Sequence, residues 1–267
     1  MEILGYIAAA LIGISLGLIG GGGSILTVPV LVYIFHIQPK LATSYSLFIV
    51  GSTSLVGAIT NYIKGWVDTK TALLFGISSI TTVFLTRRFI IHAIPENIIT
   101  IGNTTITASL LTMVLFAVLM LLASWSMIRS KKNKLAETDS PDKSNALPKL
   151  LAYGICVGLV TGLLGAGGGF LIIPTLVLLI GLPMKEAIGT SLLIIAMNSL
   201  LGFTGDIGHL QPDWKLLLTL TAISIAGIFI GIAIGKKIPG AKLKKGFGWF
   251  VLVMGIAILI KELLIGQ

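Results

Sequence analysis

Two glycine-rich stretches, each inside a long apolar segment, are the part of this sequence best suited to bind a ligand. They read GLIGGGGSILTVP over residues 17–29 and GLLGAGGGFLIIP over residues 162–174. Glycine weakens a helix by about 1 kcal/mol per residue, so these runs predict a break in each segment. Backbone N–H groups at a break attract anions, and glycine lets a ligand approach them closely. We therefore expect an anion site at Gly20, Gly22, Gly23 and Ser24 and at Gly165, Gly167, Gly168 and Gly169.

Hydroxyl and amide side chains follow each break, near the start and middle of the next apolar segment. Such groups can replace the hydration shell of a bound ion. Each also has an ordinary alternative, which is a hydrogen bond to its own backbone or to a neighbouring helix. An amide in the middle of a membrane span needs a polar partner, and this favours a functional role. The substrate-binding candidates of this kind are Ser46, Thr190, Ser191 and Asn198.

Two pairs of polar residues stand at the far ends of the same segments. Asn61 and Lys64 form the first pair, and Asp206 and His209 form the second. The i, i+3 spacing places each pair on one helix face. They are candidates for a pair of gates or for proton coupling. The alternative is that they are interfacial residues at helix ends.

The composition indicates a membrane protein. Of 267 residues, 55% are hydrophobic and 11% are charged, whereas soluble domains average about 25% charged residues. Uncharged runs of about 18 or more residues recur along the chain, which is typical of transmembrane helices. The net charge of +9 is better explained by basic loops that set membrane orientation than by nucleic-acid binding. Long basic side chains are expected to extend to lipid head groups, namely Arg87, Arg88, Lys236 and Lys237.

Motifs for several other kinds of chemistry are missing from the sequence. There is no phosphate-binding P-loop and no dinucleotide-binding glycine motif after a strand. There is no Cys/His cluster for a metal and no Ser/His/Asp set at membrane depth. We therefore expect no cofactor, no metal, no nucleic-acid partner and no enzymatic activity.

The chain contains an internal repeat. Residues 13–70 align with residues 158–215 at a constant offset of 145 and without a gap. Matching glycines, prolines and charged residues carry the argument, because apolar residues match by chance. Repeats of this kind are typical of transporters. We expect a first membrane repeat at 1–130, a polar cytoplasmic linker at 131–147 and a second membrane repeat at 148–267.

Each half contains four apolar stretches, and the first is too long for one span. As a single helix it would reach about 50 Å, against a hydrocarbon core of about 30 Å. One crossing would make the repeats parallel, whereas a hairpin at the glycines would make them inverted. The eight stretches are 3–35, 40–63, 69–91, 104–128, 149–181, 184–208, 213–235 and 243–264.

The distribution of basic residues favours the hairpin. Inverted repeats place 14 of the 19 Lys and Arg residues on one side, whereas parallel repeats divide them 10 to 9. Basic residues concentrate on the cytoplasmic side. We expect an all-α polytopic membrane protein of two inverted repeats, each with a Gly-rich broken or re-entrant hairpin followed by three transmembrane helices. Both termini are then outside and the central linker is cytoplasmic.

The doubled glycine motif resembles the TauE/SafE family, also called a sulfonate uptake permease family. Each copy is followed by TS near the start of the next segment and then by VD or PDW. The resemblance covers nearly the whole chain. It implies a plasma-membrane secondary transporter that moves sulfite, sulfonates or related small sulfur-containing or organic anions by alternating access. The positions that match the two family motifs are Gly20, Gly22, Gly23, Pro29 and Ser46, then Gly165, Gly167, Gly168, Gly169, Pro174, Thr190 and Ser191.

Several alternatives stay open at this point. An anion channel of similar architecture would conduct faster than a carrier cycle allows. A membrane enzyme would need a reactive constellation, and only Asp206 and His209 offer one. A non-transporting membrane subunit would depend on a partner. Glycines spaced four apart favour close helix packing, and one such face also makes a homodimer a candidate assembly, namely Gly227, Gly231 and Gly235.

Overall fold

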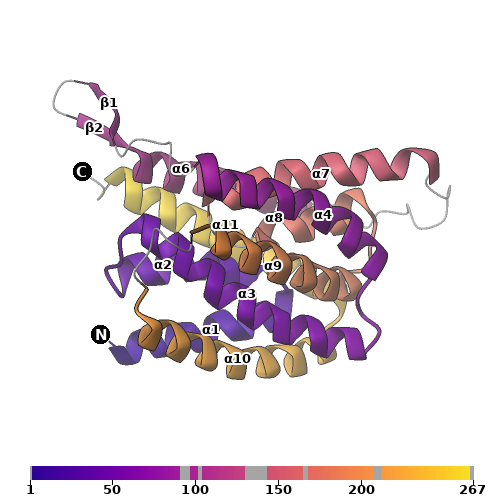
Figure 1. The fold of residues 1–267 in the computed structure, drawn as a ribbon. Coiled ribbons are helices and arrows are strands. Elements are labelled where there is room, and N and C mark those ends of the chain that lie inside the picture. Colours follow the sequence, from indigo (N-terminus) through magenta and orange to yellow (C-terminus); the bar gives the residue numbers. More distant parts are fainter. Residues whose placement is uncertain are drawn as a thin grey trace.

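A computed structural model describes residues 2–90, 97–101, 104–129, 143–164, 168–206 and 212–264. The predicted site residues Gly165, Gly167 and His209 lie outside the described residues, as does linker segment 131–142. The described chain is a bundle of helices with one small hairpin of strands at an end of the bundle (Figure 1). Both chain termini lie at the same end of the bundle.

The two halves contribute similar series of helices. The first half consists of α1 (Glu2–Ile19), α2 (Gly22–Tyr33), α3 (Pro39–Ile63), α4 (Thr69–Leu85), the π-helical η1 (Thr86–Ile90), the antiparallel strands β1 (Asn97–Ile101) and β2 (Thr104–Thr107), and α6 (Ala108–Arg129). The second half consists of α7 (Lys143–Leu164), α8 (Gly169–Pro174), the π-helical η2 (Thr175–Leu179), α9 (Met184–Asp206), α10 (Trp214–Lys237) and α11 (Gly240–Leu264).

Two predicted boundaries differ from the observed ones. The apolar stretch predicted from residue 104 opens with strand β2, and helix α6 begins at Ala108. The run TTIT before that point is rich in β-branched residues, which favour an extended strand. Helix α7 begins at Lys143, inside the segment predicted as a linker.

Helices α4 and α10 begin at matching aspartates of the repeat. The Asp68 carboxylate accepts a hydrogen bond from the N–H of Thr71 at 3.1 Å, and the Asp213 carboxylate accepts one from the N–H of Leu216 at 3.1 Å. An N-cap aspartate satisfies an N–H group that has no partner within the helix. The same local signal therefore starts the third long helix of both halves.

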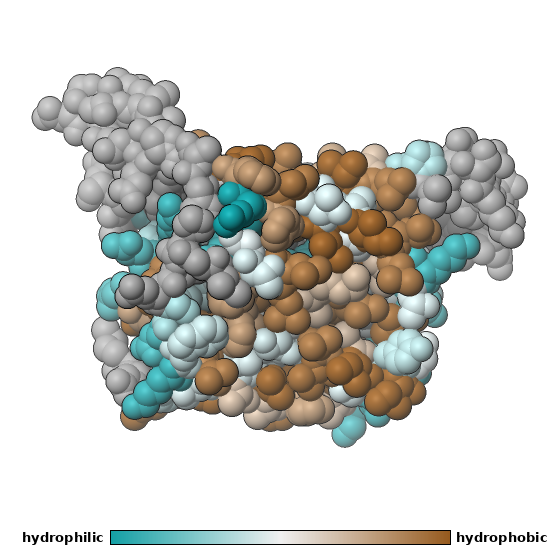
Figure 2. Space-filling view, viewed as in Figure 1, coloured by the Kyte–Doolittle hydropathy of each residue, from teal (hydrophilic) through white to brown (hydrophobic). Residues whose placement is uncertain are grey.

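The surface and the helix lengths confirm an all-α polytopic membrane protein. Among the described residues, five helical segments are long and apolar enough to span a membrane. Figure 2 shows a broad apolar surface, with hydrophilic residues gathered toward the two ends of the helices. The candidate spans are Pro39–Ile63, Thr69–Ile90, Met184–Asp206, Trp214–Lys237 and Gly240–Lys261.

Small residues on α1 and α10 let these two helices pack closely. A Cβ atom on Gly13 would lie 2.7 Å from the Ser224 carbonyl carbon, and one on Gly231 would lie 2.9 Å from the Ile14 carbonyl carbon. The prediction that these glycines serve helix packing is confirmed. The glycine face of α10 is thus occupied by α1 of the same chain. It is not available for the homodimer contact that its spacing suggested.

Helices α3 and α9 form the centre of the bundle (Figure 1). Their apolar windows are both 72% buried, against 33–44% for the other three candidate spans. The two helices run antiparallel, since Ser44 at the start of α3 bonds Asp206 at the end of α9. At the other end, a Cβ atom on Gly189 would lie 3.2 Å from the Cβ of Asn61. Helices α3 and α9 occupy equivalent places in the two halves, while the inverted arrangement of the whole repeats stays a prediction.

Candidate functional site

The first glycine run forms a tight turn between α1 and α2. Gly20 has a φ of +81°, a backbone conformation that favours glycine. Helix α2 then folds back along α1. A Cβ atom on Gly23 would lie 3.1 Å from the Ile12 carbonyl carbon, and one on Gly5 would lie 2.6 Å from the Cε2 of Phe35. The long first stretch is therefore a hairpin whose turn is at the glycines.

The second glycine run meets the first. Gly168 has a φ of +69° and precedes the first residue of α8. A Cβ atom on Gly169 would lie 2.6 Å from the Cα of Gly21 and 2.7 Å from the Cδ1 of Ile195 on α9. The two turns thus touch backbone to backbone beside α9, and no side chain fits between them.

Two of the predicted hydroxyl groups hold the first turn in place. Ser191 Oγ donates to the Ile188 carbonyl at 2.9 Å and lies 3.4 Å from the Gly20 carbonyl. Ser24 Oγ donates to the Gly21 carbonyl at 2.7 Å. Both serines are completely buried. The structure therefore places Ser24 and Ser191 at the first glycine turn, and their role in substrate binding stays a prediction.

Ser46 and Asn198 are buried in α3 and α9 with polar atoms that lack a partner. Asn198 Nδ2 donates to Ser79 Oγ at 2.6 Å. Within the described part of the chain, Asn198 Oδ1 and Ser46 Oγ have no hydrogen-bond partner. A buried unsatisfied group costs about 1–3 kcal/mol, so these atoms suit a bound water or ligand. Further buried hydroxyls of this kind, which the sequence analysis did not single out, are Thr53, Ser54, Thr161 and Ser199.

The side chain of Thr190 makes a hydrogen bond that links two helices. Its Oγ1 accepts a hydrogen bond from the backbone N–H of Asp68 at 2.9 Å. The equivalent position in the first half is Tyr45, whose hydroxyl accepts from the N–H of Asp213 at 2.6 Å. One hydrogen bond joins α9 to the start of α4, and the other joins α3 to the start of α10. Each therefore connects the two halves. The described hydrogen bonds do not bring Thr190 to the glycine turns.

One end of the α3–α9 pair contains a buried ion pair. Arg87 Nη1 lies 3.1 Å from Asp206 Oδ2, and both side chains are nearly inaccessible. Ser44 Oγ donates to the same carboxylate oxygen at 2.5 Å, and Arg87 Nη1 lies 3.3 Å from Thr43 Oγ1. The expectation that Arg87 extends to lipid head groups is wrong. A carboxylate at this depth needs a cation, and the buried arginine supplies it.

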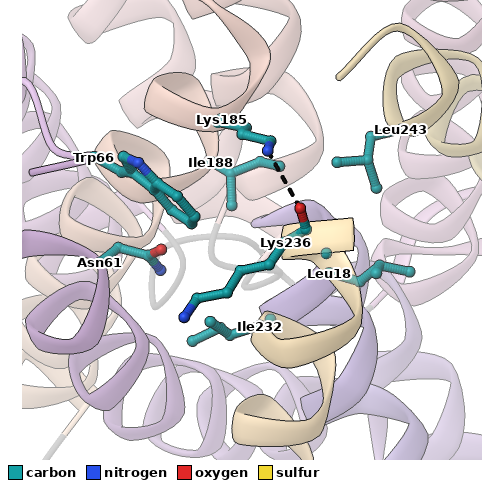
Figure 3. Close-up of a pocket in the computed structure, with 10 residues that line it drawn as sticks. Leu18, Asn61, Trp66, Lys185, Ile188, Ile232, Lys236 and Leu243 are labelled. Atoms are coloured by element: carbon teal, nitrogen blue, oxygen red, sulfur yellow. Dashed lines mark hydrogen bonds between the residues drawn. The ribbon is translucent and has the colours of Figure 1, made fainter. Parts of the chain in front are cut away.

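The opposite end of the pair contains a pocket (Figure 3). Asn61, Trp66 and Lys185 are among the residues that line it. Lys64 Nζ lies 5.8 Å from the centre of the Trp66 ring, and Lys185 Nζ lies 5.5 Å from the same ring. Partial burial, and secondly the charge of Lys236, lower the pKa of Lys64. Burial is the main cause, and the smaller contribution of Lys236 shows that two lysine charges lie near each other at this end of the pair.

The two ends occupy equivalent places in the repeat but differ in chemistry. The offset of 145 pairs Asn61 with Asp206, and the same offset, extended along the next helix of each half, pairs Arg87 with Ile232. Asn61 and Ile232 line the pocket, whereas Asp206 and Arg87 close the other end with their ion pair. The predicted gate residues Asn61 and Asp206 thus lie at opposite ends, one beside an opening and one inside a closed contact. Lys64 lies beside the same pocket, next to the ring of Trp66.

Comparisons with known proteins place the chain in a family. The family described as "Sulfite exporter TauE/SafE" matches residues 5–258. A "Probable membrane transporter protein" of Xylella fastidiosa is 28% identical over 94% of this chain and 92% of its own length. "Probable membrane transporter protein YdhB" of Bacillus subtilis is 26% identical over 93% of this chain and 96% of its own length. No solved structure matches significantly. Together with the membrane-spanning bundle, these matches show that the chain belongs to the TauE/SafE family of membrane transporters.

Proposed function

We propose that this protein is a secondary transporter that moves sulfite, a sulfonate or a related small anion across the plasma membrane by alternating access. The observation that carries the proposal is the backbone contact between the two glycine turns, where Gly169 lies against Gly21. Irregular backbone at membrane depth is tolerated only when it is buried in protein or lines a watery cavity. Broken helices that meet at the interface of two repeats are typical substrate sites of transporters.

The substrate is held by neutral groups in this proposal. Backbone N–H groups at the turns, with Ser191 and Asn198 on α9 and Ser46 on α3, supply hydrogen bonds to the anion at successive points along its path. Ser46 Oγ and Asn198 Oδ1 lack partners in the described structure. The Ser46 hydroxyl can donate a hydrogen bond to an oxyanion. The Asn198 Oδ1 can accept one from a water in the hydration shell of the anion. Neutral contacts are weak enough for a transported ion to leave again. The protein itself catalyses no covalent reaction in this proposal.

The two ends of the α3–α9 pair serve as the gates. In this proposal the end with the buried Arg87–Asp206 pair is the closed gate, and the end with the pocket beside Asn61 is the open one. Alternating access requires a second state in which this asymmetry is reversed. The repeats at 1–130 and 148–267 move against each other, and the basic pocket end faces the cytoplasm because basic residues concentrate there. Both termini are then outside.

Counterflow in liposomes tests this function. Purified protein is reconstituted with labelled sulfite, and sulfoacetate, taurine, thiosulfate, sulfate and lactate are the unlabelled competitors. We expect counterflow of labelled sulfite. Unlabelled anions that share the substrate site should reduce it. Measured conductance far above a carrier rate would indicate a channel, and the absence of any flux from folded protein would contradict the proposal.

A variant of Ser46 tests the site itself. Ser46→Ala removes a hydroxyl that has no partner in the described structure, so the protein should fold as well as before. If Ser46 binds the anion, the half-saturating sulfite concentration should rise about three- to tenfold, as for one lost hydrogen bond. Ser124→Ala is the matched control, because its hydroxyl is also buried but bonds the Leu121 carbonyl. Equal counterflow in both variants would exclude Ser46 from the site.

A variant of Gly169 tests the contact between the turns. Gly169→Val places side-chain atoms where the backbone of Gly21 lies, and it should abolish counterflow. Gly246→Val is the control, since no atom lies within 4 Å of a Cβ at that position. Both proteins are first checked for insertion and for a monodisperse elution profile. Normal flux in a folded Gly169→Val protein would contradict a substrate path through the turns.

A further inference from the structure

We propose that the pocket beside Trp66, here called the lysine pocket, binds a small oxyanion before it reaches the glycine turns. The lysine pocket is defined by Asn61, Trp66, Lys185, Ile188 and Lys236 (Figure 3). Its role as an entry site rests on the proposed transport function, whereas its ability to bind an anion does not.

The charge of the pocket is the first argument. Lys185 Nζ donates to the backbone carbonyl of Lys236 at 3.4 Å, and the Lys236 side chain extends on toward Asn61 in Figure 3. The Lys64 side chain also lies near the Trp66 ring, with its Nζ 5.8 Å from the ring centre. In the described part of the chain Lys64, Lys185 and Lys236 form no ion pair, and the Arg87–Asp206 pair lies at the opposite end of α3 and α9. Several positive charges in one concave place attract anions and raise their local concentration.

The position of Trp66 supports a built site rather than a chance gathering of side chains. The Trp66 backbone N–H donates to the Asn61 carbonyl at 3.0 Å. Its carbonyl carbon would lie 2.9 Å from a Cβ atom on Gly189, so a glycine is needed on α9 to admit this segment. The ring then lies within cation–π distance of both Lys64 and Lys185. Main-chain contacts thus fix the aromatic surface against which the ammonium groups are arranged.

The path from the pocket to the turns is short. Ile188 lines the pocket, and a Cβ atom on Gly20 would lie 3.0 Å from the Cα of Ile188. Gly17 and Leu18, in the last turn of α1 before the glycines, line the same pocket. One isoleucine therefore separates an anion in the lysine pocket from the first glycine turn.

The chemistry of the pocket limits its ligand. Its charged lining residues are Lys185 and Lys236, and most of the others are apolar, among them Leu18, Ile188 and Leu243. Ammonium groups select an anion, and the narrow space among these side chains selects a compact one. The ligand class is therefore a small inorganic or short organic oxyanion, and sulfite is the probe for the test.

Fluorescence of Trp66 reports binding directly. The chain has four tryptophans, and Trp125, Trp214 and Trp249 are 63%, 50% and 57% exposed. Replacing these three by Phe leaves Trp66 as the single emitter in the full chain, purified into lipid nanodiscs. Iodide, an anionic quencher, should quench Trp66. Sulfite should protect it in a saturable way at constant ionic strength.

Lysine variants make the test specific. In Lys185→Met and Lys236→Met, the sulfite concentration that gives half protection should rise about tenfold each, as for a lost charge-assisted hydrogen bond. Lys40→Met is the matched control, because Lys40 is the repeat equivalent of Lys185 and is exposed outside the pocket. The proposal would be overturned if sulfite did not protect Trp66 from iodide. It would also be overturned if the sulfite concentration for half protection were equal in all three variants.

Counterflow of the same proteins separates this proposal from the proposed function. Counterflow without saturable protection would leave the carrier intact and remove the lysine pocket as an anion site. Protection without counterflow would establish the anion site and contradict the carrier. Protection with counterflow, both weakened in the two pocket variants, would support the pocket as the entry site.

Discussion

At the residue scale, burial decides what each charged side chain does. Arg87 and Arg88 are neighbours in the sequence, and nothing in their local pattern distinguishes them. The structure turns Arg87 inward to the Asp206 carboxylate, with Ser44 and Thr43 as further contacts. Asp206 was predictable as a candidate because it ends an apolar segment. Its partner was not predictable, since the two residues are 119 positions apart.

Breaking the ion pair should reveal its contribution to stability. Arg87→Met leaves the Asp206 carboxylate buried without a cation, and it should lower the free energy of unfolding by about 3–5 kcal/mol. The double variant Arg87→Met/Asp206→Leu removes both charges and should recover most of that loss. Thermal unfolding of the purified proteins measures both effects. Single and double variants that unfold at the same reduced temperature would show that the uncompensated carboxylate is not the cause.

At the element scale, glycine has two distinct uses in this chain. In α1 and α10 it lies inside regular helix and permits close packing, as at Gly13 and Gly231. At Gly20 and Gly168 it adopts positive φ, just after the end of α1 and just before the start of α8. The four-residue spacing predicted the first use, and the consecutive runs predicted the second. The spacing could not identify the partner helix, because a packing groove serves the same chain as well as a second copy.

Neighbouring glycines of α10 should respond differently to alanine. A Cβ atom on Gly231 would lie 2.9 Å from the Ile14 carbonyl carbon, so Gly231→Ala forces α1 and α10 apart and should cost about 1–3 kcal/mol. At Gly235 the nearest atom would be 3.5 Å away. Gly235→Ala should therefore be neutral, or stabilising by up to about 1 kcal/mol through helix propensity. The melting temperatures of the two variants measure the loss of stability in each. Equal destabilisation by Gly231→Ala and Gly235→Ala would contradict the close contact of α1 and α10 at Gly231.

At the scale of the whole molecule, the asymmetry between the two ends of α3 and α9 is the main result. Of two equivalent places in the repeat, one contains the buried ion pair of Arg87 and Asp206, and the other contains a pocket beside Asn61. In the proposed transport cycle the two halves move against each other and exchange these arrangements. This property belongs to neither half alone.

Cysteine accessibility should report this asymmetry in the membrane. The native Cys156 is first replaced by Ser. Gly235→Cys at the lysine pocket should then react with a membrane-impermeant maleimide, whereas Thr43→Cys, at a position that is 6% exposed, should not. In sealed cells the Gly235→Cys label should require permeabilisation, since the basic end is proposed to face the cytoplasm. Equal labelling of the two cysteines would contradict a one-sided opening, and labelling of intact cells would reverse the orientation.

The sequence by itself determined the membrane class, the long helices, the repeat, the glycine turns and the family. These features depend on local composition and spacing, because hydropathy, capping and helix breaking act over a few residues. Only the tertiary structure decided which turn meets which, that Arg87 is buried against Asp206, and that Thr190 bonds the backbone of Asp68. These contacts join residues more than a hundred positions apart. Their partners follow from how the helices pack, which no local pattern in the chain records.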